Sequence, residues 1–228
     1  MAKSFKHSDM KKLNDYTQGP KSGEAPKQLV VLLHGYGSNG QDLISLAPYW
    51  QTVLPDAIFV SPDAPFPCEA GMGYQWFSLQ DYTPQKLLEG TQEAHPVLNA
   101  YLDSLLDEYG LADKDMALVG FSQGTMMSLY TGPRRKGTIA GILGYSGALI
   151  GADGLAAENK PPIHLIHGEA DSVVPVEAYH QAHEILMKNG FQVSGHTTPD
   201  LPHSIDGQGI ESGANFLSKI LNENKTLK

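Results

Sequence analysis

The most informative stretch of this chain is Ala117-Leu118-Val119-Gly120-Phe121-Ser122-Gln123-Gly124. Its apolar start is typical of a buried strand. Its end matches G-x-S-x-G, the nucleophile elbow in which a serine occupies a sharp turn between a strand and a helix. Gly120 and Gly124 suit such a turn because the backbone must pass closely on both sides of the serine. Residues 125–129 can continue directly as a helix, whose N-terminus would point toward an oxygen reacting with Ser122.

Length, composition and charge describe an ordinary soluble protein. The chain has 228 residues, of which 41% are hydrophobic and 18% are charged, and it can form one domain with a large core. The formal net charge of −9 argues against nucleic acid or an anionic membrane as the main partner. No apolar run reaches the length of a membrane span, and the N-terminal lysines are not followed by the apolar segment of a secretory signal. Cys68 is the only cysteine, which excludes an internal disulfide and favours a cytoplasmic location; we interpret it as a bystander thiol.

Strand-like and helix-like segments alternate along the chain. Short apolar runs predict strands at residues 28–33, 57–60, 113–119, 138–145, 163–166 and 191–197. Helical spacing predicts helices at residues 41–51, 83–109, 177–189 and 207–221, with a kink or break at Pro96. This alternation predicts an α/β fold with a mostly parallel central sheet and helices on both faces. We expect a lead-in with at most one short strand at residues 1–27, a single domain at 28–221 and a tail at 222–228.

Two loops after later predicted strands carry the groups that a serine nucleophile needs. A serine hydroxyl requires a base to take its proton, and the base requires an acid to fix its tautomer. Asp171 follows the predicted strand at 163–166, and His203 follows the one at 191–197. The order serine, aspartate, histidine is the one expected of α/β-hydrolases, so we predict that Ser122, Asp171 and His203 act together.

Each of these three residues has a rival in the sequence. Ser146 also ends a predicted strand, but Ala148 stands where the second glycine of an elbow belongs. Glu169 is an alternative acid, only two residues before Asp171. His196 is an alternative base, but it lies inside a predicted strand. The spacing therefore favours the first set over the rivals.

A negatively charged intermediate at the serine would need two backbone N–H donors. One donor is expected from the residue after the nucleophile, Gln123, and the other from the glycine-containing turn after the first core strand. We predict that Tyr36 is the second donor, because Gly35 and Gly37 on either side allow close approach. His34 is interpreted as a structural residue of this turn, since His203 already provides the base.

Residues 66–82 have no regular pattern and are rich in glycine and aromatic residues. Loops of this length are usually functional or disordered, and this one is too apolar for disorder. We therefore predict that it lies over the mouth of the site, where Trp76, Phe77 and Met72 would contact a substrate. Packing in the core is the alternative for Trp76 and Phe77.

Six short motifs follow one another in this chain: Leu33-His34-Gly35-Tyr36-Gly37, Ser61-Pro62-Asp63-Ala64-Pro65, Gln75-Trp76-Phe77, Gly120-Phe121-Ser122-Gln123-Gly124, His167-Gly168-Glu169-Ala170-Asp171 and Pro202-His203. In this order they resemble the phospholipase/carboxylesterase family, a group of small α/β-hydrolases without a separate cap domain that includes the acyl-protein thioesterases. The resemblance covers about residues 28–221. It implies the α/β-hydrolase fold, the roles given above for the serine, acid, base and oxyanion donors, and hydrolysis of carboxylic or thioester bonds without a cofactor. It also makes a homodimer plausible. Many relatives have leucine at the position of Tyr36, where the larger ring would narrow the pocket.

These observations predict a serine hydrolase that cleaves carboxylic esters through an acyl-enzyme intermediate. Short- to medium-chain acyl esters and lysophospholipids are the expected small-molecule substrates, and an acyl-protein or small-molecule thioesterase with the same residues is the alternative. No metal is expected. His180 and His183 lie one turn apart beside Glu177 and Glu184, but a solvated helix face is the simpler interpretation.

Two other classes of protein compete with this prediction. Gly35, Gly37 and Gly40 satisfy the G-x-G-x-x-G pattern of a dinucleotide-binding oxidoreductase, with Asp63 after the next predicted strand. That interpretation leaves the elbow and the later aspartate and histidine unexplained. A catalytically inactive binding module on the same scaffold is disfavoured by the complete set of reactive residues.

Overall fold

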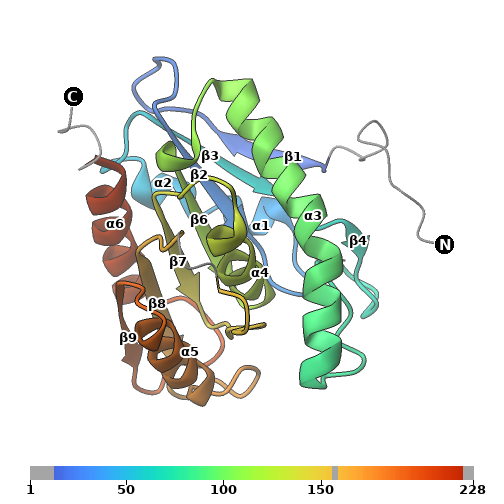
Figure 1. The fold of residues 1–228 in the computed structure, drawn as a ribbon. Helices are drawn as coiled ribbons and strands as arrows, with labels where there is room; N and C mark the ends of the chain where they lie inside the picture. Colours follow the sequence, from blue (N-terminus) through green and yellow to red (C-terminus); the bar gives the residue numbers. More distant parts are fainter. Residues whose placement is uncertain (1–12, 156–158, 223–228) are drawn as a thin grey trace.

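The computed structural model describes residues 13–155 and 159–222, which form a seven-stranded sheet between two layers of helices (Figure 1). In this sheet the edge strand β1 (Asp15–Gln18) runs antiparallel to its neighbour β3 (Ala57–Pro62), and the other described neighbouring pairs are parallel. The predicted mostly parallel sheet is therefore confirmed. In spatial order the strands are β1 (Asp15–Gln18), β3 (Ala57–Pro62), β2 (Gln28–Leu33), β6 (Met116–Phe121), β7 (Gly141–Tyr145), β8 (Ile163–Gly168) and β9 (Val193–Thr198).

The central strands are apolar throughout because helices cover both of their faces. All six residues of β2 are buried, and alternate side chains point to opposite faces. Leu29, Val31 and Leu33 belong to one half of the core, which is covered by α3 (Pro84–Tyr109), α4 (Gln123–Thr131) and α5 (Glu177–Lys188). Val30 and Leu32 belong to the other half, which is covered by α1 (Gly40–Ile44), α2 (Ala47–Trp50) and α6 (Gly207–Asn222).

Proline divides one of the predicted helices but not another. The segment predicted as one helix at 41–51 forms α1 and α2, because Pro48 has no N–H group to donate to the preceding turn. In contrast, α3 continues through Pro96 as one element of 26 residues. Its ends follow common rules: Thr83 accepts a hydrogen bond from the Lys86 N–H at the start, and Gly110 has a left-handed backbone at the end.

The described part of the predicted lead-in contains one short strand, as the prediction for this segment allowed. Strand β1 pairs with β3, so residues 15–18 form the sheet edge. Other boundaries differ by a few residues: β7 begins at Gly141 rather than residue 138, and β9 begins at Val193 rather than residue 191. The parts of the predicted lead-in and tail at residues 1–12 and 223–228 lie outside the described residues.

The segment at 66–82 contains a small hairpin that is attached to the turn after β2. Strands β4 (Phe66–Pro67) and β5 (Tyr74–Gln75) pair with each other. The Gly37 N–H donates to the Tyr74 carbonyl at 2.9 Å, and the Tyr74 N–H donates to the Ser38 carbonyl at 2.8 Å. The hairpin therefore holds the turn that contains the predicted donor Tyr36.

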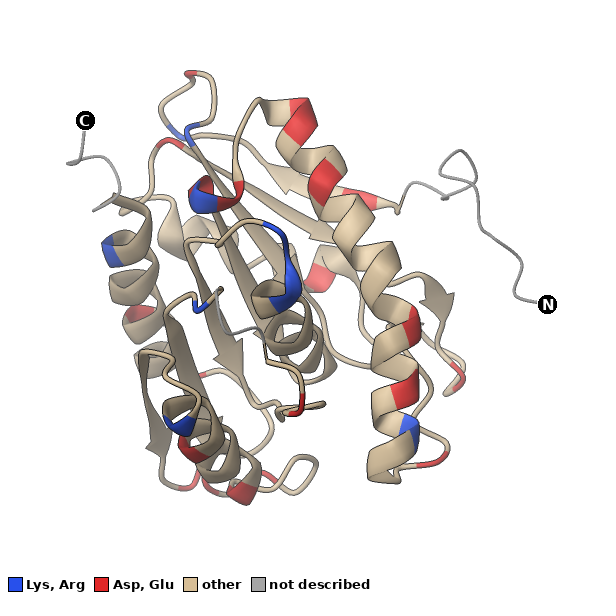
Figure 2. Ribbon diagram, in the orientation of Figure 1, with Lys and Arg blue, Asp and Glu red and all other residues tan. Residues whose placement is uncertain are grey.

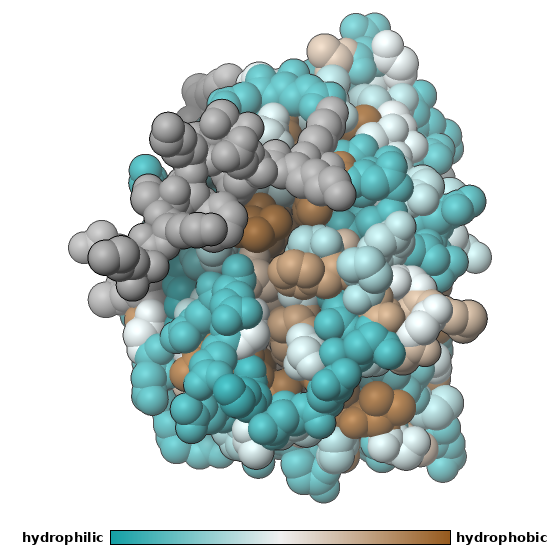
Figure 3. Space-filling model, turned by 90° about the vertical axis from the view of Figure 1, so that its right-hand side faces the viewer, coloured by the Kyte–Doolittle hydropathy of each residue, from teal (hydrophilic) through white to brown (hydrophobic). Residues whose placement is uncertain are grey.

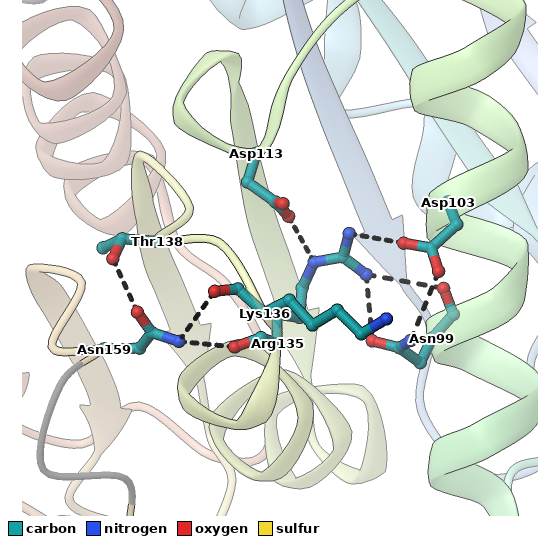
Figure 4. Close-up of polar contacts among 7 residues, drawn as sticks. All are labelled: Asn99, Asp103, Asp113, Arg135, Lys136, Thr138 and Asn159. Atoms are coloured by element: carbon teal, nitrogen blue, oxygen red, sulfur yellow. Dashed lines mark hydrogen bonds and ion pairs between the residues drawn. The ribbon is translucent and has the colours of Figure 1, made fainter.

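A buried arginine joins α3 to the segments that flank β6 and β7 (Figure 4). The Arg135 guanidinium donates to Asp103 at 2.7 Å, to the Asn99 amide oxygen at 3.0 Å and to Asp113. Its side chain is 3% exposed. The amide of Asn159 donates to the Arg135 carbonyl, which extends the network toward β8. One side chain thus connects elements that are far apart in the sequence.

The described surface carries more acidic than basic side chains. Acidic residues lie along the outer side of α3 and in several loops (Figure 2). On the face shown in Figure 3, the uncovered hydrophobic residues form separate patches among hydrophilic ones. Within the described residues, the helices are all too short or too polar to cross a membrane.

Candidate active site

The elbow has the strained geometry that its sequence predicts. Ser122 has φ 55° and ψ −116°, which is unusual for a residue with a side chain. A Cβ at Gly120 would lie 2.4 Å from the Thr125 nitrogen, and one at Gly124 would lie 1.8 Å from the Leu33 carbonyl oxygen. Glycine is therefore required at both positions. Ser122 stands at the carboxyl end of β6 and at the start of α4, where it is 8% exposed.

The predicted acid and base are in direct contact. His203 Nδ1 lies 2.6 Å from Asp171 Oδ2, and the Asp171 side chain is fully buried. Because an ionised carboxylate can only accept, the proton of this bond is on Nδ1, and Nε2 retains the lone pair that a base uses. The His203 ring packs against the ring of Phe121, with the centroids 4.9 Å apart. The structure thus places the imidazole beside the residue that precedes Ser122.

The surroundings of Asp171 favour its charged form. Burial alone would raise the pKa of this carboxyl. The hydrogen bonds from His203 and from the Val174 and Val173 N–H groups outweigh burial, so the pKa lies below its ordinary value. Both of these N–H groups donate to Oδ1 at 2.8 Å. The carboxylate therefore remains ionised and has a fixed orientation at neutral pH.

The loops that carry the acid and the base are bonded to each other. The Ala170 N–H donates to the Leu201 carbonyl at 3.0 Å, and the Glu169 N–H donates to the Thr198 carbonyl at 2.9 Å. A Cβ at Gly168 would lie 2.2 Å from the Leu201 carbonyl oxygen, so the two loops are as close as backbones can be. Their contact explains how residues far apart in the sequence meet.

The alternative acid, base and nucleophile from the sequence have other surroundings in the structure. Glu169 accepts a hydrogen bond from the Thr197 hydroxyl at 2.7 Å and does not contact His203. His196 lies in β9 with its ring 6.3 Å from that of His164. Ser146 is 1% exposed, and its hydroxyl has no partner within the described part of the chain. Neither alternative acid nor alternative base is therefore placed as Asp171 and His203 are.

The turn after β2 lies next to the elbow and contains the Tyr36 N–H, the second predicted oxyanion donor. His34 Nε2 accepts from the Ala64 N–H at 2.9 Å, so Nδ1 carries the proton and donates to the Gly35 carbonyl at 2.7 Å. Trp76 Nε1 donates to the His34 carbonyl at 3.0 Å. The Tyr36 N–H has no acceptor among the described residues, and a Cβ at Gly35 would lie 3.2 Å from that of Ser122.

The other predicted donor lies at the start of α4. The Gln123 N–H is in the first turn of this helix, where N–H groups have no acceptor within the helix. The predicted donors Tyr36 and Gln123 thus belong to the two segments that flank Ser122. Burial lowers the pKa of His34 and keeps the ring neutral, as its structural role in the turn requires.

Two of the three residues predicted to contact a substrate are packed in the core. Both also line a cavity of about 340 Å³ beside α3, so their contact with a substrate remains a prediction. Trp76 is fully buried, and Phe77 is 3% exposed. The buried Gln123 amide fixes their backbone: Oε1 accepts from the Trp76 N–H at 2.9 Å, and Nε2 donates to the Phe77 carbonyl at 2.8 Å. These contacts favour the core-packing alternative. Met72 is 78% exposed and remains available to a ligand.

The residues that would bind a dinucleotide already have other partners within the protein. Asp63 is 3% exposed and accepts from the Gly40 N–H at 2.9 Å and from the Asn14 amide at 2.7 Å. A Cβ at Gly40 would lie 2.2 Å from the Ser61 carbonyl oxygen, which explains this glycine by packing alone. An acid that binds a ribose must be free to accept from its hydroxyls, so the turn does not suit a dinucleotide.

Two other candidate sites lie apart from this set. A cavity of about 910 Å³ at the amino ends of β7, β8 and β9 contains none of the predicted reactive residues, and its lining includes Phe216 and His164. His180 and His183 pack beside Tyr179 on α5, with ring centroids at 5.3 Å and 6.0 Å. Among the described residues, no group of three or more histidines, cysteines or acids is placed to hold a metal.

Two side chains beside the site have no role predicted from the sequence. His167 Nε2 lies 3.4 Å from Asp171 Oδ2, a contact that no pattern in the sequence indicates. The Gln123 amide links the elbow to residues 76–77, whereas the elbow motif points only to the backbone N–H of this residue.

Comparison with known proteins agrees with the motifs and the fold. A sequence profile of the family described as phospholipase/carboxylesterase matches residues 17–221. The chain is 28% identical over 191 residues to esterase YpfH of Escherichia coli strain K12, covering 84% of this chain and 82% of that protein. It is 30% identical over 228 residues to acyl-protein thioesterase 1 of Mycosarcoma maydis, covering 89% of this chain and 95% of the relative.

A solved structure gives the same result in three dimensions. The crystal structure of esterase PE8 superposes with a TM-score of 0.87 and 42% sequence identity, and the match covers 92% of this chain and all of that one. The resemblance inferred from the six motifs is therefore confirmed. The chain belongs to the phospholipase/carboxylesterase family of α/β-hydrolases and is an esterase-type hydrolase.

Proposed function

We propose that this protein hydrolyses acyl esters through an acyl-enzyme formed on Ser122. The Ser122 hydroxyl oxygen attacks the acyl carbon while His203 Nε2 accepts its proton, and Asp171 holds the imidazole and stabilises its charged form. The N–H groups of Tyr36 and Gln123 stabilise the oxyanion. His203 then protonates the leaving alcohol as the ester C–O bond breaks. Water next attacks the acyl carbon while His203 accepts its proton. The bond to Ser122 breaks, His203 returns the proton to the serine oxygen, and the carboxylic acid is released. No metal or organic cofactor takes part in this scheme.

The observation that best supports the proposal is the 2.6 Å bond between His203 and Asp171 beside the elbow. It fixes the tautomer in which Nε2 is free to act as a base. The strained backbone of Ser122 supports its role as nucleophile. The Tyr36 N–H, which has no acceptor in the part of the chain that the structure describes, supports its role as an oxyanion donor. These features occur together at the carboxyl edge of the sheet, where ligands bind in α/β folds.

The direct test is covalent labelling of the serine. A fluorophosphonate probe should modify the wild-type protein at Ser122, and mass spectrometry of the digested product should locate the adduct on the peptide that contains this residue. Pretreatment with the probe should abolish hydrolysis of p-nitrophenyl butyrate in proportion to the label incorporated. Full labelling at another residue, or full activity after complete labelling of Ser122, would exclude the mechanism.

Apolar side chains are exposed on the segment that contacts the turn after β2 and on the loop that carries the acid. They suit an acyl substrate, which we propose to be of short to medium length. In the segment that contacts the turn around Tyr36 (the oxyanion turn), Phe66, Met72 and Tyr82 are 46%, 78% and 54% exposed. In the loop that carries Asp171, Val173 is 61% exposed. Apolar groups of this kind would shield an acyl chain from water. Carboxylic esters are the proposed substrates, with lysophospholipids among them, and thioesters are the alternative. A panel of acyl lengths on matched ester and thioester leaving groups distinguishes these classes.

We expect Trp76→Phe to lower kcat about 10-fold with little change in KM. The substitution removes the Nε1 donor that holds the His34 carbonyl, and the adjoining oxyanion turn then loses a fixed orientation. The orphaned carbonyl should also cost about 1–3 kcal/mol of stability. Steady-state kinetics and urea unfolding of the same preparation measure both effects.

The matched control for this substitution is Trp50→Phe. Trp50 is also fully buried, and its Nε1 donates to the Ile210 carbonyl at 3.1 Å on the other face of the sheet. The control should lose similar stability while its kcat stays within twofold of wild type. Equal losses of kcat in the two variants would show that Trp76 affects catalysis only through general stability.

Activity should fall as the pH is lowered, because a single catalytic group becomes protonated and can no longer act as a base. The reaction needs the neutral form of the His203 imidazole, because a protonated ring cannot accept the proton of Ser122. Asp171 adds no second step to this fall, because its pKa lies below its ordinary value and the carboxylate stays charged. A plot of log(kcat/KM) against pH should therefore rise with a slope of one on the acid side. A slope of two, or a flat profile down to pH 5, would contradict the assignment.

The proposed partners follow from composition and family. The formal charge of −9 and a single cysteine support a cytoplasmic enzyme that acts on small molecules and does not bind nucleic acid or insert stably into membranes. A homodimer is proposed from the family resemblance. Size-exclusion chromatography with light scattering at several protein concentrations tests it.

A further inference from the structure

A second histidine, which the proposed mechanism does not use, is buried next to the acid. His167 lies in β8, four residues before Asp171, and its side chain is 2% exposed. Burial lowers its pKa and favours a neutral ring. A buried polar side chain normally has a defined hydrogen-bond partner, so its role follows from the groups around the ring.

The position of the proton on this ring follows from its partner. His167 Nε2 lies 2.7 Å from the carbonyl oxygen of Val174, and a carbonyl oxygen can only accept. Nε2 therefore carries the proton in the neutral ring. The same nitrogen is 3.4 Å from Asp171 Oδ2, so the N–H group that donates to the loop carbonyl also lies close to the carboxylate.

These contacts place His167 at the centre of the support for the carboxylate. The Val173 and Val174 N–H groups donate to Oδ1, and His167 holds the carbonyl of Val174. The other carboxylate oxygen, Oδ2, accepts from His203 and lies beside the His167 N–H. Without the His167 donor, the turn at Val173 and Val174 that orients Oδ1 would lose a hydrogen bond that holds it. Oδ2 would also lose the nearby partial positive charge of the His167 N–H.

We propose that His167 is a positioning residue that fixes the plane and place of the Asp171 carboxylate, and through it the orientation of the His203 imidazole. The proposal rests on the function proposed above for Asp171 and His203. His167 touches neither a substrate nor Ser122 in this scheme. It acts on the reaction by keeping the acid–base pair in one geometry, and small displacements of such groups lower turnover strongly.

The test compares two amides of different reach. In His167→Gln the side-chain amide can reach the position of Nε2 and donate to Val174, whereas in His167→Asn it reaches only the position of Nδ1. The Asn variant should lose about 10- to 100-fold in kcat with KM within twofold of wild type, and the Gln variant should recover most of that loss. The downfield proton resonance of the His203–Asp171 hydrogen bond should shift or broaden in the Asn variant and return in the Gln variant.

A control on the same strand separates positioning from packing. His164 is partly buried in β8 and bonds the Ser194 and Ser212 hydroxyls, away from Asp171. His164→Asn should leave both kcat and the resonance unchanged. Wild-type kcat and resonance in His167→Asn would overturn the proposal, and so would an equal loss in the Gln and Asn variants.

Two further measurements keep the test decisive. If His167→Asn does not fold, ring-nitrogen NMR of the wild-type protein replaces it: the proton must be on Nε2 of His167, and a proton on Nδ1 would overturn the proposal. Ser122→Ala separates the two proposals, because it removes the nucleophile without touching the acid–base pair. If that variant keeps its activity, the proposed function fails, while the resonance still reports on His167.

Discussion

Replacement of Ser122 by alanine is expected to lower kcat for p-nitrophenyl butyrate by on the order of 10⁴-fold or more. The substitution removes the oxygen that attacks the acyl carbon and leaves the oxyanion donors in place. Alanine has no hydroxyl, and a water molecule bound in its place would not be an equally reactive nucleophile. Little of the reaction should therefore survive. Titration of active sites with the fluorophosphonate probe gives the concentration of residual wild-type enzyme, which sets the lower limit of the assay.

The adjacent strand offers a matched control for this prediction. Ser146 also follows a parallel strand and has a left-handed backbone, with φ 48°, yet within the described residues no base is bonded to its hydroxyl. Ser146→Ala should keep kcat within about threefold of wild type, as expected of a substitution outside the reacting groups. Retention of a tenth of the wild-type rate by Ser122→Ala, or a comparable loss in the control, would show that the nucleophile is another residue.

The second large effect is expected on stability, from Arg135→Met. The substitution keeps an apolar stem but removes the charge that Asp113 and Asp103 share, and it leaves the Asn99 amide oxygen without its donor (Figure 4). Breaking a buried ion pair commonly costs about 3–5 kcal/mol, and the partial exposure of both acids lowers this to about 2–4 kcal/mol. Urea unfolding followed by circular dichroism measures the loss without adding salt.

A neighbouring lysine serves as the control for Arg135. Lys136 is exposed, and Lys136→Met should change the free energy of unfolding by no more than about 0.5 kcal/mol. The effect of Arg135→Met should persist at about 0.5 M NaCl, because salt screens buried pairs much less than exposed ones. Equal effects of the two substitutions, or disappearance of the Arg135 effect in salt, would show that the network contributes only as a surface interaction.

The sheet was predictable from the sequence because its central strands are buried on both faces. Short continuous apolar runs such as residues 28–33 are typical of strands covered on both sides, and their alternation with helices implies parallel pairing. The edge was harder to predict. Strand β1 has the sequence Asp-Tyr-Thr-Gln and is at most half buried, so nothing in its composition separates it from a polar lead-in. Its pairing depends on β3, which is distant in the sequence.

The candidate site was predictable where topology alone brings residues together. Loops at the carboxyl ends of parallel strands share one edge of the sheet, so Ser122, Asp171 and His203 could be expected at the same edge from the sequence. Aromatic residues in an irregular segment carry no such information. Trp76 and Phe77 suit a groove or a core equally well by composition, and the Gln123 amide that draws their backbone inward is 46 or 47 residues away.

The role proposed for His167 could not be predicted from the sequence for a related reason. An imidazole at this position can be a ligand, a base or a packed core residue, and only its distances to Val174 and Asp171 separate these possibilities. The four-residue spacing would place the pair on one face of a helix. Here the first residue is in β8 and the second in a loop, so helical spacing gives no guide to their contact.

The backbone bonds between residues 169–170 and 198–201 have a consequence for protein engineering. Lengthening either loop by one residue would displace the partner on the other loop as well, so the two segments cannot be varied independently in a library. A chimera that imports the acid from a homologue should therefore import the histidine segment with it, as one cassette.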